Sequence, residues 1–563
     1  MMTDMRATGF VHAGEVASEG EFSHDANVVE NSRDPIGMVL EIGGSEAQIA
    51  LDLQRLQECA ADADPSIALA GQVGSQVKIR VGSNGLLASV RRQKQDNATP
   101  GGVLATVDFV GEGSQERLTG RIHSFRRGVT GYPIPGAYIY PATSADLKQI
   151  YASDGRASIE IGNVYPTRDI RAGLYVDALL GKHFALLGST GTGKSTSASL
   201  ILHKICEHSP EAHVVMIDPH GEYGSAFRNI GMILDVTNLQ MPYWLMNFAE
   251  HCEVFITNKG PDRQEDEEIL GKCLLEARAK NRLAEQLGKV TADAPVPYLI
   301  SDLSTILQNE MGKLDKGRTV APYLRLKAKI DEIKGDPRYQ FMFSGMLVAD
   351  TMADFLTKIF RLPTRGKPIS IIDVSGVPSD ITSTVVAVLS RLIFDFAIWS
   401  RDEKTRPILL VCEEAHRYVP NERNVDGSSV GKILSRIAKE GRKYGISLGL
   451  VTQRPSDLAE GVLSQCGTII AMRLNNDRDQ AFVKAAMPEG SRGFLDSIPA
   501  LRNRECIICG EGVSIPIRAT FDDLEEFKRP ASEDPSFSQL WTNSGGEEEM
   551  MSRTVQRWRA QGR

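Results

Sequence analysis

One stretch of this 563-residue chain has the residue types and spacing that hold phosphate. Gly188-Ser-Thr-Gly-Thr-Gly-Lys-Ser195 matches the P-loop pattern in full, between an apolar run, His183 to Leu187, and an amphipathic stretch from Lys194 to about His208. Its glycines let backbone N–H groups turn toward a phosphate at a helix N-terminus, where the helix dipole favours negative charge. The spacing predicts binding of ATP or GTP by Gly188, Ser189, Thr190, Gly191, Thr192, Gly193, Lys194, Ser195 and Thr196.

A nucleotide bound by this loop needs a cation and acidic partners. Lys194 is predicted to bridge the β- and γ-phosphates, and the Ser195 hydroxyl to ligate Mg²⁺. The apolar run Pro407 to Cys412 ends abruptly in Glu413 and Glu414, and adjacent like charges are a poor choice for a merely structural strand end. We expect Glu413 near Mg²⁺ and Glu414 as the base that orients the attacking water. Many P-loop enzymes have Asp at the first of these positions, so Glu413 departs from the common pattern.

A second acidic strand end follows the run Val214 to Ile217. Parallel strands present their carboxyl ends on one edge of a sheet, so Asp218 and Glu222 could reach the same phosphate cleft, with Asp218 as a further Mg²⁺ ligand. The alternative is that Asp218 caps a turn.

The stretch Val430 to Tyr444 has a helical period with two different faces. Its apolar residues recur at helical spacing, and Lys432, Arg436, Lys439 and Lys443 form the opposite face, which in most proteins is simply solvated. Gln453, at the end of the next apolar run, sits where a γ-phosphate sensor would sit. Arg442 follows Gly441 and is predicted to point away from its own nucleotide, toward the site of a neighbouring subunit.

Charge and cysteine usage narrow the class of protein. There are 64 Lys and Arg against 72 Asp and Glu, a formal charge of -8, so any nucleic-acid site must be a local basic patch. Eight sparse cysteines favour a reducing compartment. Cys506 and Cys509 lack the second pair that a zinc site needs, and alternation predicts two core cysteines in a strand. We expect no metal site beyond Mg²⁺.

The chain is expected to be cytoplasmic. Its first residues lack the apolar segment of a signal peptide. The most apolar helical stretch, Val385 to Trp399, carries Arg391 and Asp395, which argues against a membrane span.

Sequence patterning divides the chain into six segments. Residues 1–33 are expected to be a flexible arm and residues 34–142 a small β-barrel or sandwich. Strands alternating with helices then predict a parallel α/β sheet in two parts, residues 143–245 and 351–526, separated by a helical insertion at 246–350 and followed by a polar tail at 527–563.

The expected strands can be given individually. The predicted strands of the barrel are Gly37 to Ile42, Ala47 to Leu51, Gln76 to Val81, Leu86 to Val90, Val103 to Val110 and Arg117 to Ile122. Those of the α/β sheet are His183 to Leu187, His213 to Ile217, Ile369 to Val374, Ile408 to Cys412 and Ser447 to Val451.

The motifs GSTGTGKS, DPHGEY, CEEAH, EGRKYG and VTQRPS, in this order, resemble the HerA branch of the HerA-FtsK translocases over roughly residues 35 to 540. The resemblance implies a RecA-like P-loop ATPase core preceded by a HAS-barrel-like domain. In that family Lys194 and Ser195 match the nucleotide loop, Glu414 the catalytic acid and Gln453 the sensor. Arg442 matches the finger supplied in trans, with Arg436 as the second candidate.

The resemblance also implies an assembly and partners. It implies a homo-hexamer that threads double-stranded DNA through its central pore and moves along it by ATP hydrolysis. It further implies an effector docked on the barrel, either a NurA-type or other nuclease in DNA-end processing, or a sirtuin-type NADase in antiphage defence.

Two other functions stay open on the sequence. One is a nucleotide-controlled ring scaffold that holds and activates an effector without translocation. The other is a membrane-coupled conjugation or secretion ATPase, which shares the motor core.

Overall fold

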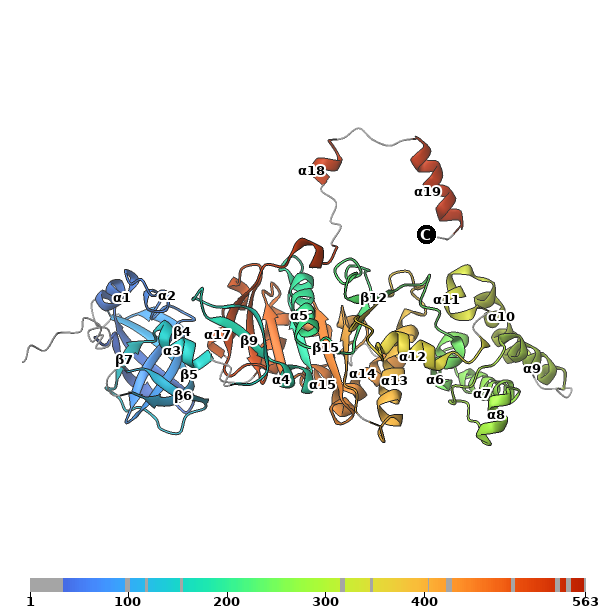
Figure 1. The fold of residues 1–563 in the computed structure, drawn as a ribbon, viewed down its shortest axis with the longest axis horizontal. Coiled ribbons are helices and arrows are strands. Elements are labelled where there is room, and N and C mark those ends of the chain that lie inside the picture. The colour runs from blue at the N-terminus through green and yellow to red at the C-terminus, as the bar shows by residue number, and fades with distance from the viewer. Residues whose placement is uncertain are drawn as a thin grey trace, which may run out of the picture.

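The computed structural model describes residues 34–96, 102–116, 120–151, 155–313, 319–344, 348–403, 405–421, 428–487, 492–531, 537–542 and 548–560. A β-barrel lies at one end of an elongated molecule, a large α/β sheet lies in the middle and a group of helices lies at the other end (Figure 1). The predicted fold class, an α/β core with a small β-barrel and a helical insertion, is confirmed.

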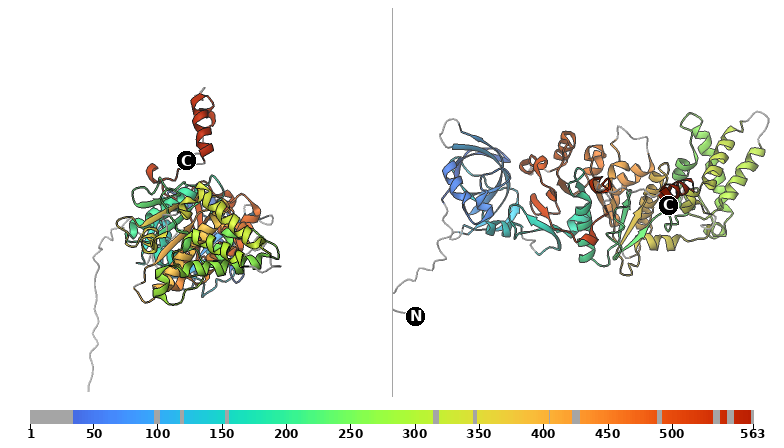
Figure 2. Two further views of the ribbon diagram at one scale, coloured as in Figure 1. Left: turned by 90° about the vertical axis from the view of Figure 1, so that its right-hand side faces the viewer. Right: turned by 90° about the horizontal axis from the view of Figure 1, so that it is seen from above.

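The barrel is built from antiparallel strands that close on themselves. Six strands hydrogen-bond in the order β2-β1-β7-β3-β4-β5, and β5 also pairs with β2, which closes the ring. Figure 2 gives a view of the barrel from above. Closure leaves a separate apolar core, with Val39, Ile49, Val77, Ile79 and Val107 among its fully buried side chains. The strands are β1 (Gly37–Ile42), β2 (Glu46–Asp52), β3 (Gln76–Val81), β4 (Asn84–Gln95), β5 (Gly102–Gln115), β6 (Ile122–Arg127) and β7 (Tyr138–Pro141).

A buried ion pair connects the barrel to the rest of the chain. Helix α3 (Ser144–Tyr151) carries Asp146, whose side chain is fully buried 2.7 Å from the Nζ atom of Lys78 on β3. Asp146 also accepts a hydrogen bond from the backbone N–H of Ile122. Two further helices, α1 (Leu53–Ala60) and α2 (Pro65–Ala68), lie between β2 and β3.

The middle of the molecule is one eleven-stranded sheet, in the order β12-β13-β11-β14-β15-β10-β16-β17-β18-β8-β9. The strands from β12 to β16 run parallel, and those from β16 onward pair antiparallel. The bounds are β8 (Ser158–Val164), β9 (Arg171–Tyr175), β10 (Phe184–Leu187), β11 (Val214–Asp218), β12 (Gly231–Leu234), β13 (Ile369–Asp373), β14 (Ile408–Cys412), β15 (Ile446–Thr452), β16 (Thr468–Met472), β17 (Glu505–Gly510) and β18 (Ile517–Phe521).

Helices cover this sheet, so its central strands are buried on both faces. Their sequences are continuous apolar runs, as is usual for buried parallel strands. Every residue of β10, β14 and β15 is buried. The covering helices and other connections are α4 (Val176–Gly181), α5 (Lys194–His208), α12 (Met352–Phe360), α13 (Thr382–Trp399), α14 (Ser429–Glu440), α15 (Glu460–Leu463), α16 (Asp477–Ala486) and α17 (Arg492–Leu495).

The helical insertion lies between β12 and β13 in the chain. Arg278 of this insertion is fully buried and donates from Nη2 to the carbonyl oxygens of Trp244 and Met246, which holds the start of the insertion against α7. The helices are α6 (Phe248–Phe255), α7 (Arg263–Ala279), α8 (Arg282–Leu287), α9 (Ile300–Gly312), α10 (Ala321–Gly335) and α11 (Gln340–Phe343).

Among the described residues, α13 is the one helix long and apolar enough to cross a membrane by length and composition. More than half of it is buried inside the protein. Its Arg391 forms a two-pronged ion pair with Glu250, at 2.8 Å and 3.0 Å, and a further pair with Asp395. These contacts are those of a core helix.

The expected α/β strands all occur, with bounds that differ by a residue or two. The last expected barrel strand is misplaced, because β6 begins at Ile122, where the prediction ends, and residues 117–119 lie outside the described part. The arm at residues 1–33 also lies outside it. The polar tail contains two helices, α18 (Phe537–Leu540) and α19 (Glu548–Ala560), which extend away from the body in Figure 1.

A buried histidine in the insertion makes the free energy of unfolding decrease as the pH falls. His251 donates from Nδ1 to the carbonyl oxygen of Asn247 at 2.7 Å, so its Nε2 accepts from the Tyr298 hydroxyl at 2.9 Å. Burial lowers the pKa of His251 to about 3. An unfolded histidine takes up a proton below about pH 6.5, so the unfolded state alone gains this proton as the pH falls toward 3.

We therefore expect the wild-type chain to lose about 2 to 3 kcal/mol of stability between roughly pH 7 and pH 4.5 through this residue. His251→Gln, which cannot titrate, should melt lower at neutral pH but lose less on acidification. Melting curves at both pH values check this, with His208→Gln on the surface as control. An acid-induced loss as large in His251→Gln as in wild type would contradict the assignment.

Candidate functional site

The P-loop lies at the carboxyl end of β10, and α5 begins at Lys194. Gly191 and Gly193 have φ angles of 78° and 92°, a left-handed conformation that side chains disfavour. Gly188 is needed for space, because a Cβ atom there would lie 2.9 Å from the Cβ atom of Met472. The loop therefore has the glycines that its geometry requires.

The acid pair meets the P-loop lysine in a buried ion cluster. The Nζ atom of Lys194 lies 2.8 Å from Oε1 of Glu413 and 3.5 Å from Oε1 of Glu414. All three residues are buried, at 7%, 3% and 5% exposure. Burial favours the neutral amine, but the two carboxylates outweigh it and raise the pKa of Lys194. The structure thus brings together the cation and both predicted acids.

The two acids have opposite pKa shifts. Burial raises the pKa of Glu413 to about 7, although Lys194 opposes this. Burial acts in the same direction on Glu414, but a hydrogen bond from His416 and the charge of Lys194 outweigh it and hold its pKa below the ordinary value. Two carboxylates whose environments separate their pKa values are suited to different roles. Glu414 is the one that stays ionised.

Three neighbouring strands bring the remaining predicted groups to this edge. The sheet order β14-β15-β10 places Glu414 and Gln453 at the ends of β14 and β15, beside the P-loop. The Thr190 hydroxyl of the P-loop donates to the side-chain oxygen of Gln453. The predicted sensor therefore contacts the loop that it would monitor.

Asp218 adopts the turn conformation that the sequence left as the alternative. Its side chain is fully buried, and its oxygens accept from the backbone N–H groups of His220, Gly221 and Tyr223 at 3.2, 2.9 and 2.9 Å. Burial raises its pKa despite these hydrogen bonds. Because three amides already use its oxygens, the structure favours a cap over a direct metal ligand.

Other features at this edge fit Mg²⁺. Oε2 of Glu413 is buried without a hydrogen-bond partner among the described residues, and the Ser195 hydroxyl lies on the first turn of α5. A buried carboxylate oxygen without a partner is costly unless a ligand satisfies it. Ser195 and Glu413 are the residues predicted to hold the ion. The described residues contain no cluster of three His, Cys, Asp or Glu side chains suited to another metal.

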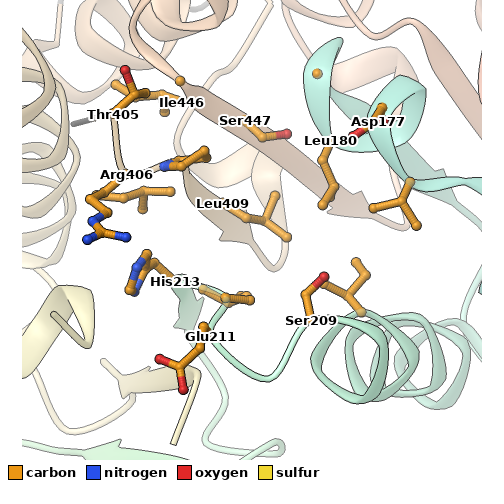
Figure 3. A pocket seen from close by; sticks show the side chains of 18 of the residues that line it. Asp177, Leu180, Ser209, Glu211, His213, Thr405, Arg406, Leu409, Ile446 and Ser447 are labelled. Atoms are coloured by element: carbon orange, nitrogen blue, oxygen red, sulfur yellow. The ribbon is translucent and has the colours of Figure 1, made fainter. Parts of the chain in front are cut away.

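Arg442 lies at the opposite edge of the same sheet. It is exposed on a short 3-10 helix, η7 (Gly441–Tyr444), and lines a cavity of about 590 Å³ together with Ile408 and Ile446, the first residues of β14 and β15. Figure 3 shows this cavity from close by. Strands of this length separate Arg442 from its own P-loop by roughly 15 Å. Arg442 thus lies far from the nucleotide site of its own subunit.

Two further details of this region bear on the choice between Arg442 and Arg436. Gly441 has helical angles, φ -55° and ψ -36°, and a Cβ atom there would make a tight contact, 3.3 Å from the backbone oxygen of Ile446. Arg436 is engaged within its own subunit, with its Cζ atom 4.5 Å from the Phe394 ring centre and its Nε 3.3 Å from Glu440. Arg442 is the better placed of the two arginines.

Sequence reasoning gave no role to several residues of the site. His416 and Thr452 contact one another beside Glu414, although both stand in the quoted motifs. A cavity of about 260 Å³ beyond the P-loop is lined by Gly193, Thr196, Arg504 and Phe521. Arg504 comes from a loop 311 positions after Gly193, and no local sequence pattern indicates that it lies beside the P-loop. Cys506 and Cys509 are buried residues of β17, as predicted.

Comparisons with known proteins agree with this geometry. Residues 159–393 match the family model described as "Helicase HerA, central domain". The DNA double-strand break repair helicase HerA of Pyrococcus furiosus is 26% identical over 457 residues, which cover 74% of this chain and 78% of the relative. The protein of that name from Saccharolobus solfataricus is 26% identical over 405 residues, covering 70% of this chain and 74% of the relative.

The structure of VirB4 of Thermoanaerobacter pseudethanolicus aligns with a TM-score of 0.47 and 16% identity, over 67% of this chain and 99% of that one. The predicted resemblance to HerA-type proteins and the RecA-like P-loop ATPase fold are confirmed.

The buried cluster predicts separable effects of its members. Lys194→Ala should abolish nucleotide binding, because it removes the cation that bridges the phosphates. Glu414→Gln should keep ATP binding but lower hydrolysis by at least about 10²-fold, the contribution of a general base. Phosphate release and binding of a fluorescent ATP analogue measure the two steps.

Glu310→Gln, in the helical insertion, serves as the matched control. Unchanged hydrolysis by the Glu414→Gln protein would overturn the assignment of the base.

Proposed function

We propose that this chain, whose residues 159–393 match the model of the central domain of helicase HerA, is an ATP-driven motor that works as a hexameric ring on double-stranded DNA. The chain has the fold and the site of an ATP-hydrolysing P-loop enzyme. The observation that carries the proposal is the division of the site. Lys194 and the acid pair lie at one edge of the sheet, and the exposed Arg442 lies at the other.

The residues of one subunit prepare ATP for attack. The Lys194 ammonium contacts both Glu413 and Glu414, and a bound γ-phosphate would compete with them for it. Glu414, ionised, would then orient water and receive its proton, and Gln453 would exchange its contact with Thr190 for the γ-phosphate. Ser195 and Glu413 would hold Mg²⁺, which supplies charge neutralisation on the phosphate oxygens.

DNA is the proposed track. The relatives are named as repair helicases, and the exposed stripe of Lys432, Lys439 and Lys443 is local positive charge on an acidic chain. Basic side chains that contact backbone phosphates give binding without sequence preference, which a translocating ring needs.

We also propose that the barrel docks an effector, a nuclease in end processing or a NADase in defence. The barrel has its own core and lies at the end of the molecule opposite the insertion, where a partner could bind without blocking the sheet (Figure 1). The protein would work in the cytoplasm.

A translocation assay tests the motor. The protein, with ATP and Mg²⁺, should displace a third strand bound to linear duplex DNA, and Glu414→Gln should bind the duplex without displacing the strand. Wild-type hydrolysis with no displacement would instead favour the ring scaffold, the second candidate function. The scaffold predicts that Glu414→Gln still activates a co-purifying effector in the presence of ATP.

The trans role of Arg442 can be tested by mixing inactive subunits. Arg442→Ala should lower hydrolysis by about 10³ to 10⁵, as the loss of a trans arginine does in other phosphoryl-transfer enzymes. Mixing it with Lys194→Ala subunits should restore part of the activity, because some interfaces then join an intact P-loop to an intact arginine.

Arg436→Ala is the matched control and should stay active, since Arg436 contacts Phe394 and Glu440 of its own chain. No recovery in rings shown to exchange subunits would count against a finger supplied in trans.

A further inference from the structure

A histidine joins the ends of the two strands that carry the acid pair and the sensor. His416 lies on a 3-10 helix, η5 (Ala415–Arg417), directly after Glu414. Its Nδ1 atom is 3.2 Å from Oε2 of Glu414 and 3.0 Å from Oγ1 of Thr452, the last residue of β15. Thr452 is fully buried and the His416 side chain is 16% exposed. One ring nitrogen therefore faces both strand ends.

The chemistry of the neighbours places the hydrogen on that nitrogen. An ionised carboxylate only accepts, so a ring nitrogen with a bare lone pair would be repelled by Glu414. Oγ1 of Thr452 accepts from the backbone N–H of Arg454 at 3.1 Å and has capacity to accept once more. The Nδ1 atom of His416 is thus hydrogen-bonded to Oγ1 of Thr452 and lies 3.2 Å from Oε2 of Glu414, one contact at each strand end.

Thr452 is also in contact with the nucleotide loop. Its carbonyl oxygen accepts from the backbone N–H of Gly188, the first P-loop residue, at 3.2 Å. The next residue is Gln453, whose side chain accepts from Thr190. The P-loop and Gln453 are therefore each connected to Thr452 directly or through a single residue.

Glu414 is suited to respond to a displacement of these residues. It is a non-glycine residue with φ 49° and ψ 46°, a left-handed backbone conformation that costs energy unless its surroundings hold it. Its carboxylate lies between Lys194 on one side and His416 on the other. These two contacts hold the carboxylate in its orientation.

We propose that His416 is a positioning residue that couples the orientation of Glu414 to the nucleotide contacts of the P-loop and Gln453, through Thr452. The proposal rests on the proposed function, in which Glu414 orients the attacking water. With Gln453 on Thr190, His416 is hydrogen-bonded to Thr452 and in contact with the Glu414 carboxylate. When Gln453 turns to the γ-phosphate, Thr452 moves with it and His416 sets Glu414 for the attack. ATP would thereby be hydrolysed only when Gln453 contacts the γ-phosphate.

A merely structural histidine predicts different behaviour. It would contribute to folding, and its loss would lower the melting temperature while leaving the turnover of the folded protein intact. A positioning residue changes turnover at constant nucleotide affinity, since misplacement of a reacting group by about 1 Å can cost 10²-fold.

The experiment measures ATP turnover, KM for ATP and melting temperature in the full-length protein. His416→Ala should lower kcat by about 10 to 10²-fold with KM nearly unchanged. His416→Asn, whose side-chain N–H can replace Nδ1–H, should recover much of that loss. Thr452→Val, which keeps the size of the side chain but lacks Oγ1, should lower kcat in the same way, and Thr452→Ser should restore it.

The double variant His416→Ala/Thr452→Val decides whether the two residues act together. We expect its loss of kcat to be close to that of the larger single variant, because both changes break the same link. Fully additive losses would overturn the coupling. Should His416→Ala fail to fold, the Asn, Val and Ser variants still give the comparison.

Two controls separate this inference from the proposed function. His208→Ala, at the exposed end of α5, should behave as wild type. Glu414→Gln, if active, refutes the base itself. If Glu414→Gln is inactive while His416→Ala turns over at the wild-type rate, the base stands and the positioning role of His416 is wrong.

Discussion

One buried cation, Lys194, contacts two carboxyl groups, so the cluster has fewer positive charges than acidic groups. The rest of the site depends on how this difference in charge is accommodated. Lys194 can neutralise only one charge, so the pair Glu413 and Glu414 cannot both be ionised there without further help. The structure resolves the conflict by geometry. Glu413 is deeply buried and holds a proton more readily, whereas Glu414 receives a hydrogen bond from His416. Because both acids are buried at the P-loop, they lie close to the position that the charged phosphates and Mg²⁺ of a nucleotide would occupy.

The parallel sheet makes this cluster possible. Strands β14, β15 and β10 lie side by side and end together, so residues far apart in the chain meet at one edge without any of them lying on a long loop. Their apolar interiors fix the register, and each strand ends where the sequence changes from apolar to polar. The rigidity of the sheet is what allows small side-chain movements at its edge to matter.

Much of this could be predicted from the sequence, because the decisive signals are local. The P-loop pattern, the abrupt acid pair after β14 and the polar end of β15 each lie within a few residues, and their strands were found within a residue or two. The antiparallel strands β8, β9 and β18 were not predicted, since partners from both ends of the sequence form this half of the sheet and no local period shows the pairing. Asp218 shows the same limit: an acid at a strand end suits a metal or a turn equally, and only its three amide contacts separate the two.

The position of Arg442 has a consequence for how activity depends on concentration. If each nucleotide site takes an arginine from its neighbour, a lone chain contains every part of the machinery and yet no complete site. The rate of hydrolysis per molecule would then rise with protein concentration, from almost none in free subunits to its full value in closed rings. A cell that holds unassembled copies of the chain would consume little ATP until enough subunits met. Placing the two halves of the site at opposite edges of one sheet would thus limit ATP hydrolysis by unassembled subunits.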